Sequence, residues 1–234
     1  MKKLSVILIA ILSFAVVRSQ EMNDPNAQVR AVSTFRGISV SNAFDVYLSQ
    51  SNSEAVAVSA ASIKDRDMIT VEVKNGILEI RLDKDWKWTS GNKKLKAYIS
   101  FKNIDKLEIS GACDVFISGV IKADKLDIHQ SGASDLKGKV DVKKLNVDLS
   151  GASDITITGL ATQLTVESSG ASDFKGYELV TEICDARASG ASDIKITVNK
   201  ELSAHASGAS DVKYKGSGVT KEIKSSGSSS VSKS

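Results

Sequence analysis

The chain has 234 residues, one proline, 5% aromatic residues and a formal net charge of +3. Its excess of basic residues lies at the amino terminus: without Lys2, Lys3 and Arg18, 28 basic residues face 28 acidic residues. This balance excludes the basic surface of a typical nucleic-acid-binding domain, so we expect no nucleic-acid partner.

Residues 1–19 have the pattern of a secretory signal peptide. Two lysines precede an apolar run from Leu4 to Val17, and small residues lead to Gln20. The run has about 14 residues, which is short for a membrane-spanning helix; the alternative is an anchor that stays attached. We therefore expect a periplasmic, cell-surface or extracellular protein without a transmembrane span in the mature chain.

The first part of the mature chain has no fixed period. Residues 20–31 are polar and predict a flexible segment. Residues 32–104 predict an irregular β region, since apolar and polar residues alternate at 69–73 and 77–82 around an Asn75-Gly76 turn.

Residues 105–231 repeat the phrase Ser-Gly-Ala-Ser-Asp at intervals of about 19 residues, which is typical of a solenoid. An earlier stretch, residues 41–46, resembles the phrase with Asn42 in the glycine position. A polar tail follows at 232–234. The repeated glycines that we expect to form the turns are Gly111, Gly132, Gly151, Gly170, Gly190 and Gly208, with Gly227 as a degenerate copy.

Two apolar columns accompany the repeat. The residues four before and four after each glycine are apolar, and their neighbours are polar, so each repeat predicts one coil of strands and turns. The fold class is therefore all-β: a parallel β-solenoid with coils of about 19 residues, preceded by a small irregular β region. Parallel crossovers are usually right-handed, and we expect that hand here.

Each turn also carries an aspartate. Stacked coils would place these carboxylates about 4.8 Å apart, where neighbours repel by about 0.9 kcal/mol in water. We favour a structural ladder whose carboxylates accept hydrogen bonds within their own turn; the alternative is a row of cations shared between neighbours. We predict no cofactor. The ladder comprises Asp114, Asp135, Asp154, Asp173, Asp193 and Asp211.

One exposed column contains candidates for catalysis. Asp148 and Glu167 occupy equivalent positions in adjacent repeats, with His129 before them and Arg187 after them. Paired carboxylates could act on a glycoside, so a polysaccharide-active enzyme using Asp148, Glu167 and Arg187 is the alternative function. We favour a solvated ion-paired surface, because repeats of uniform length leave no loops to wall a cleft.

The tryptophans and cysteines are the remaining candidates. Trp86 and Trp88 lie on one side of a predicted strand and could stack on a sugar ring or cover a hydrophobic end. Cys113 and Cys184 lie four coils apart, too far for a disulfide. We expect Cys184 in the core and Cys113 in the turn.

The segments 35–40, 45–48 and 75–80, followed by the serial phrase, resemble the DUF2807 family over residues 32–231. This family is described as a putative auto-transporter adhesin, head GIN domain, and is frequent in Bacteroidetes. The resemblance implies a β-solenoid and supplies no catalytic residues to carry over. We therefore predict a non-enzymatic binding or surface-structural module, adhesive in character, whose partner is a cell-surface glycan or protein; the sequence predicts no oligomeric state.

Overall fold

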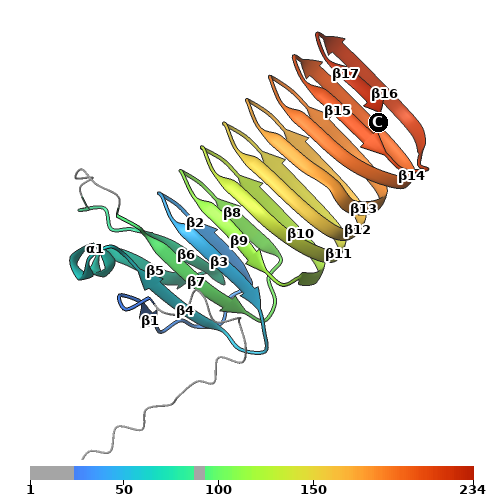
Figure 1. The fold of residues 1–234 in the computed structure, drawn as a ribbon. Coiled ribbons are helices and arrows are strands. Elements are labelled where there is room, and N and C mark those ends of the chain that lie inside the picture. The colour runs from blue at the N-terminus through green and yellow to red at the C-terminus, as the bar shows by residue number, and fades with distance from the viewer. Residues whose placement is uncertain (1–23, 87–92) are drawn as a thin grey trace, which may run out of the picture.

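The computed structural model describes residues 24–86 and 93–234 and confirms the all-β solenoid. Strands of successive coils pair in parallel and form one continuous stack (Figure 1). The leader predicted at 1–19 lies outside the described residues. Within the described ranges, no helix has both the length and the apolar character needed to cross a membrane.

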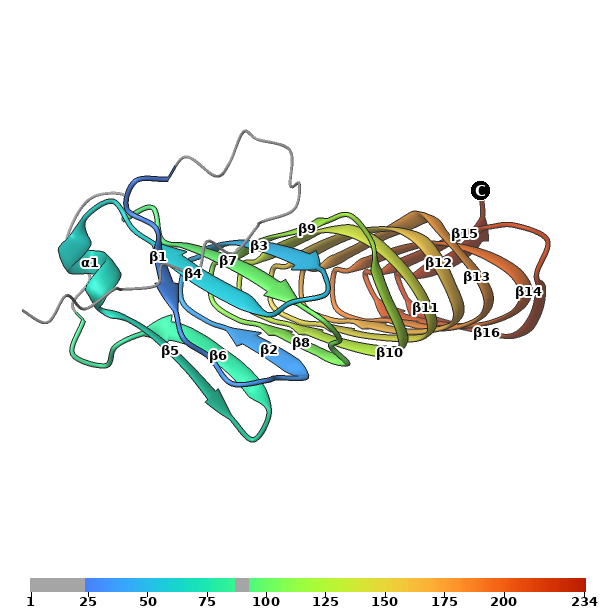
Figure 2. The same cartoon turned by 90° about the horizontal axis from the view of Figure 1, so that it is seen from below.

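Each regular coil is one long, bent strand that runs from one turn to the next. Figure 2 shows the coils as flattened loops lying side by side. We call the residues that follow each turn the first face, and those that precede the next turn the second face. The strands of this part are β10 (Ile121–Gln130), β11 (Asp135–Leu149), β12 (Asp154–Ser168), β13 (Asp173–Ala188), β14 (Asp193–Gly208), β15 (Asp211–Lys215), β16 (Val219–Gly227) and β17 (Ser230–Lys233).

The region expected to be irregular contributes to the same stack. β2 (Gly37–Val40) and β3 (Asp45–Gln50) pair in parallel with β8 (Lys106–Ile109) and β9 (Asp114–Ser118). Asn42 has a φ of 84° and lies where later coils have glycine, so residues 41–46 form a true turn. The irregular β region is therefore continuous with the regular stack: residues 51–105 separate this coil from its neighbour along the sequence, although the two coils pair directly in space.

Antiparallel strands cover the amino-terminal end of the stack. β6 (Ile77–Leu82) and β7 (Lys96–Phe101) pair in parallel with β2 and β3, and they carry the antiparallel strands β5 (Ile69–Lys74) and β4 (Ala55–Ser59). The Asn75-Gly76 turn joins β5 to β6, as predicted. A short helix, α1 (Ile63–Asp67), lies between β4 and β5.

The segment 20–31 is only partly described, and its described part departs from the prediction of flexibility. Residues Gln28–Arg30 form β1, which pairs antiparallel with β4. The side chain of Arg30 donates a hydrogen bond to the carbonyl of Arg66 at 3.2 Å. These contacts fix residues 28–30 on the end of the stack, and the polar composition alone does not reveal this pairing.

The turns need glycine because adjacent coils approach closely there. Gly151 has a φ of +79°, and a Cβ on it would lie 2.5 Å from the carbonyl oxygen of Gly132. The serine two positions later is buried and donates its hydroxyl within the turn: the Ser153 Oγ–Ser150 O distance is 2.8 Å. Each turn therefore combines a glycine that allows stacking with a serine that closes it.

Both cysteines are free and buried. Cys184 pairs in register with Leu164 on one side and Leu202 on the other, which confirms its place in the core. Cys113 occupies the turn position that is serine in the following coils, and its Sγ lies 3.4 Å from the carbonyl oxygen of Ser110. Burial raises the pKa of the Cys113 thiol to about 11 and that of Cys184 further still.

Candidate functional site

The exposed column of the second face lies in the predicted register. Asp148 pairs with Glu167 on the next coil, and Glu167 pairs with Arg187. The Arg187 guanidinium lies 3.0 Å from Glu167 and 2.9 Å from Asp185, while His129 Nδ1 lies 3.6 Å from Asp148. The side chains of Asp148 and Glu167 are 61% and 52% exposed. The structure thus brings the candidate residues together on an open face, with Arg187 ion-paired to Glu167 and Asp185.

A depression of about 340 Å³ lies where this column approaches the turns. Glu108, His129 and Asp148 line it, together with Ser39, Ser110, Ser131 and Ser150. A hydrogen bond from Lys106 at 2.6 Å holds the pKa of Glu108 below its ordinary value. Glu167 and Arg187 are not among the lining residues. The depression therefore contains only one of the three predicted catalytic residues, Asp148, together with residues such as Glu108 that were not predicted as site residues.

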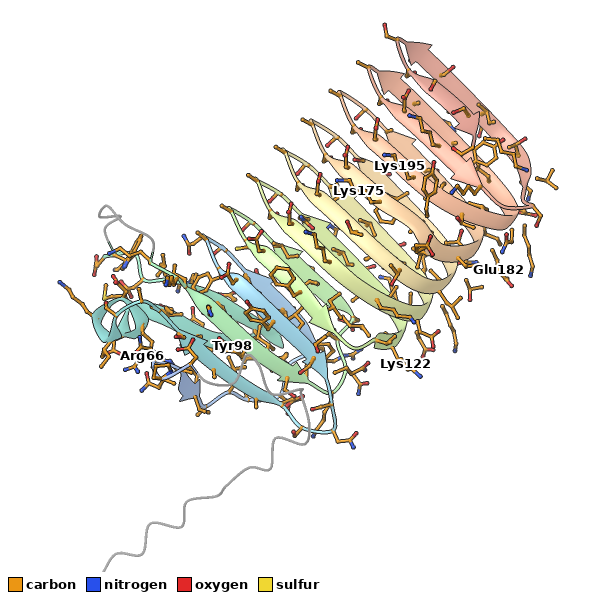
Figure 3. The ribbon with its side chains drawn as sticks, in the orientation of Figure 1. Arg66, Tyr98, Lys122, Lys175, Glu182 and Lys195 are labelled. Atoms are coloured by element: carbon orange, nitrogen blue, oxygen red, sulfur yellow. The ribbon has the colours of Figure 1, made fainter. Side chains whose placement is uncertain are left out.

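The aspartates of the repeat form a ladder on the first face. Asp135, Asp154 and Asp173 pair in register from coil to coil. Lys175 bridges the last two, with its Nζ 2.6 Å from Asp154 and 3.6 Å from Asp173. Figure 3 shows Lys175 and Lys195 on neighbouring coils of this face. Lysine therefore offsets part of the like-charge repulsion.

The hydrogen bonds of the aspartates differ from the prediction. Buried serines such as Ser153, Ser172 and Ser192 make the internal hydrogen bonds of their turns, whereas the Asp154 carboxylate contacts the Lys175 side chain. At Asp211 the hydroxyl of Ser230, one coil on, donates at 2.7 Å and lowers the pKa of that carboxyl. At Asp45, burial and then the neighbouring Asp114 carboxylate raise the pKa. The aspartate ladder thus links coils across the stack.

Only one of the two tryptophans, Trp86, lies within the described residues. Trp86 packs partly buried against the hydrophobic core, and its backbone N–H donates to the carbonyl of Asp83 at 3.0 Å. Trp88 lies outside the described residues. Trp86 is thus held within the fold, and glycan contact by the pair stays a prediction.

The first face also carries a ladder of stacked aromatic rings, which the sequence analysis did not predict. Tyr98, Tyr47 and Phe116 come from β7, β3 and β9 and stack with ring centroids 5.3 Å and 5.6 Å apart. Tyr47 and Phe116 each follow a turn aspartate by two residues, which was a usable signal. Tyr98 belongs to a coil without the turn phrase, so nothing in its local sequence reveals its place.

A second depression, of about 430 Å³, lies beside this ladder. Tyr47, Tyr98, Lys96 and Asp24 are among its lining residues, and the Tyr98 hydroxyl donates to Asp24 at 3.2 Å. Across residues 24–86 and 93–234, no three His, Cys, Asp or Glu side chains are placed to hold a metal ion. Most of the side chains that line the two depressions are polar.

The comparisons with known proteins agree on family and fold. The model of the DUF2807 family, described as "Putative auto-transporter adhesin, head GIN domain", matches residues 34–218. No curated protein matches the chain. A solved structure described as a "putative adhesin" from Bacteroides fragilis is 24% identical, with a TM-score of 0.81, over 89% of this chain and 96% of that chain.

Two further solved structures share the fold. One, described as a "Putative lipid binding protein" from Parabacteroides distasonis, is 19% identical with a TM-score of 0.68, over 90% of this chain and 98% of that chain. A "putative adhesin" from Parabacteroides merdae is 15% identical with a TM-score of 0.68, over 89% of this chain and 95% of that chain. At these identities the structures establish the solenoid and no activity.

Proposed function

We propose that this chain, which belongs to the DUF2807 family, is an exported, non-enzymatic module that binds a cell-surface glycan or protein through the flat faces of its solenoid. The observation that carries the proposal is the character of the second face. Glu167 and Arg187 form an ion pair between neighbouring coils, and His129 and Asp148 line an open depression on the coils before them. Such a face offers repeated hydrogen-bonding groups to an extended partner.

The ion pairs favour binding over glycoside hydrolysis. A glycosidase needs two carboxyl groups that are free to flank the scissile bond. The carboxylate of Glu167 is instead engaged by the Arg187 guanidinium at 3.0 Å. Asp148 and Glu167 also lie more than half exposed on a flat face, where water screens their charges. These observations support a recognition surface.

The chemistry of the depression fits a polyhydroxylated ligand. Carboxylates accept hydrogen bonds, serine hydroxyls donate and accept, and imidazole does both. Glu108, His129 and Asp148 present these groups on three successive coils, beside the serines of the adjoining turns. A glycan lying along the stack would therefore meet a hydrogen-bonding side chain and a turn serine on each of these three coils.

The test is binding of the purified protein to an array of glycans and matrix proteins. Three variants accompany the wild type: His129→Ala/Asp148→Ala at the depression, Trp86→Ala/Trp88→Ala for the tryptophan pair, and Glu182→Ala as a surface control. Glu182 lies along the edge of the stack, with Lys122 (Figure 3). We expect saturable binding that only the first variant loses.

Other outcomes would redirect or overturn the proposal. Loss of binding in the tryptophan variant alone would move the site to the tryptophan pair. Absence of binding by the wild type would contradict a binding role. Release of sugar from a polysaccharide, abolished by Glu167→Gln, would establish the enzymatic alternative instead.

A further inference from the structure

The last coil leaves both of its strands with one neighbour each. Within the described residues, β16 pairs only with β14, and β17 pairs only with β15. Ile223 of β16 is 44% exposed, whereas Ala204, its partner in the preceding coil, is fully buried. This end of the stack therefore presents unpaired backbone groups and the open end of an apolar column to solvent.

The two ends of the stack are not equivalent. At the amino-terminal end, β4 and β1 continue one face as antiparallel strands, and β5 does the same on the other face. At the carboxyl-terminal end, both outer strands belong to the parallel ladder. An unprotected parallel edge readily accepts another strand, so natural proteins usually cover it.

We propose that a second copy of this chain covers this end, tail to tail. A two-fold axis perpendicular to both the strands and the stack would pair β16 with β16 and β17 with β17, each antiparallel. Such an isologous contact closes on itself as a dimer, whereas head-to-tail stacking would produce filaments. The apolar column that ends at Ile223 would then continue into the second copy.

The sequence of β16 is self-complementary about this axis. It contains Lys221-Glu222-Ile223-Lys224, and an axis through Ile223 sets Ile223 opposite its own copy. Glu222 then lies opposite Lys224 of the second copy, and Lys224 lies opposite the second copy's Glu222. Opposite charges on directly paired residues stabilise antiparallel strands.

The same axis can also pass through the other face. The turn between the two strands is centred on Gly227-Ser228, and Ile223 and Ser232 lie equally far from that centre along the chain. One axis can therefore pass through the middle of β16 and, at Ser232, through β17. The Ser229 hydroxyl, bonded to the Ser226 carbonyl at 2.8 Å, closes the turn and fixes this spacing.

A charge-swap experiment tests the contact directly. The protein is expressed with its leader and purified, and its mass in solution is measured by analytical ultracentrifugation over a concentration series. We expect a dimer for the wild type and monomers for Glu222→Lys and for Lys224→Glu, because each variant places like charges opposite each other twice. An equimolar mixture of the two variants should form a heterodimer.

The mixture separates pairing from folding. Each variant also breaks the Glu222–Lys224 ion pair at 2.5 Å within its own chain, and mixing cannot restore that contact. Circular dichroism checks that both variants keep the β fold. A monomeric wild type, dimeric single variants, or a mixture that stays monomeric would each overturn the proposal.

Discussion

At the scale of single residues, the turn glycines have two roles that can be separated. Gly151 and Gly76 both have a φ near +80°, but a Cβ on Gly151 would lie 2.5 Å from a backbone oxygen, whereas a Cβ on Gly76 would meet nothing within 4 Å. Gly76→Ala should cost only the backbone strain, about 1–2 kcal/mol. Gly151→Ala should lower the midpoint of thermal unfolding clearly further than Gly76→Ala does. Equal decreases for the two variants would contradict the close approach of neighbouring coils at Gly151.

Cys113 gives a pH-dependent prediction at the same scale. Burial raises its thiol pKa from 9.0 to about 11, so between these values the unfolded chain releases the proton and the folded chain keeps it. Stability from this group is therefore present below pH 9 and is lost as the pH rises toward 11.

The test is Cys113→Ser, which restores the serine found in the following turns. The variant should unfold at nearly the wild-type temperature at pH 7, because the new hydroxyl can donate to Ser110. At pH 10 the wild type should lose more stability than the variant. Lysines and tyrosines titrate in both proteins, so parallel pH profiles would show that the thiol makes no contribution.

At the scale of the repeated element, the buried serine column should matter more than the exposed serines beside it. Ser192 Oγ donates to the Ser189 carbonyl at 2.9 Å and accepts from the Ser189 N–H at 3.2 Å. Ser192→Ala would remove these bonds and the buried bond that the hydroxyl also donates to the Ser168 carbonyl at 3.0 Å, at a cost of about 1–3 kcal/mol. The exposed neighbour provides the control, since Ser189→Ala removes only a surface hydroxyl. Chemical denaturation that ranks the two variants in the opposite order would contradict this role.

The regular coils could be predicted from the sequence because the residues that set the register of each coil lie within that coil. Each turn phrase fixes the register of its own coil, so the apolar columns, the aspartate ladder and the place of Cys184 could all be read from spacing. The capped end could not be read in this way. β3 lies between β7 and β9 although about 50 residues separate β3 from β7, and no local pattern encodes such a pairing.

The candidate site follows the same division. The neighbourhood of Asp148 and Glu167 followed from the repeat, but their partners depended on side-chain direction. Arg187 reaches Glu167 and Asp185, whereas the depression gathers Glu108 and His129 around Asp148. The aromatic ladder depended on the unpredicted order β7–β3–β9. Periodicity therefore locates residues on a face, and the stacking order decides which of them meet.

At the scale of the whole molecule, stability should vary along the stack. Each coil contacts only its neighbours, so a defect within the stack weakens two interfaces and a defect in the last coil weakens one. Ile128 and Ile223 form a matched pair, because both belong to the same inward column, yet Ile128 is fully buried and Ile223 is 44% exposed. Ile128→Ala should lower the free energy of unfolding by about 2–5 kcal/mol, and Ile223→Ala should lower it clearly less.

Protein concentration turns this comparison into a test of how the last coil is covered. In solution dilute enough for the chain to be monomeric, the unfolding midpoints of Ile128→Ala and Ile223→Ala should differ most. Amide hydrogen exchange of the wild type should then be fastest in β16. If a second copy covers Ile223, the cost of Ile223→Ala should grow as concentration rises, because dimerisation stabilises only the folded state. The cost of Ile128→Ala should stay nearly constant. A gap between the two variants that does not change with concentration would mean that Ile223 remains exposed in solution.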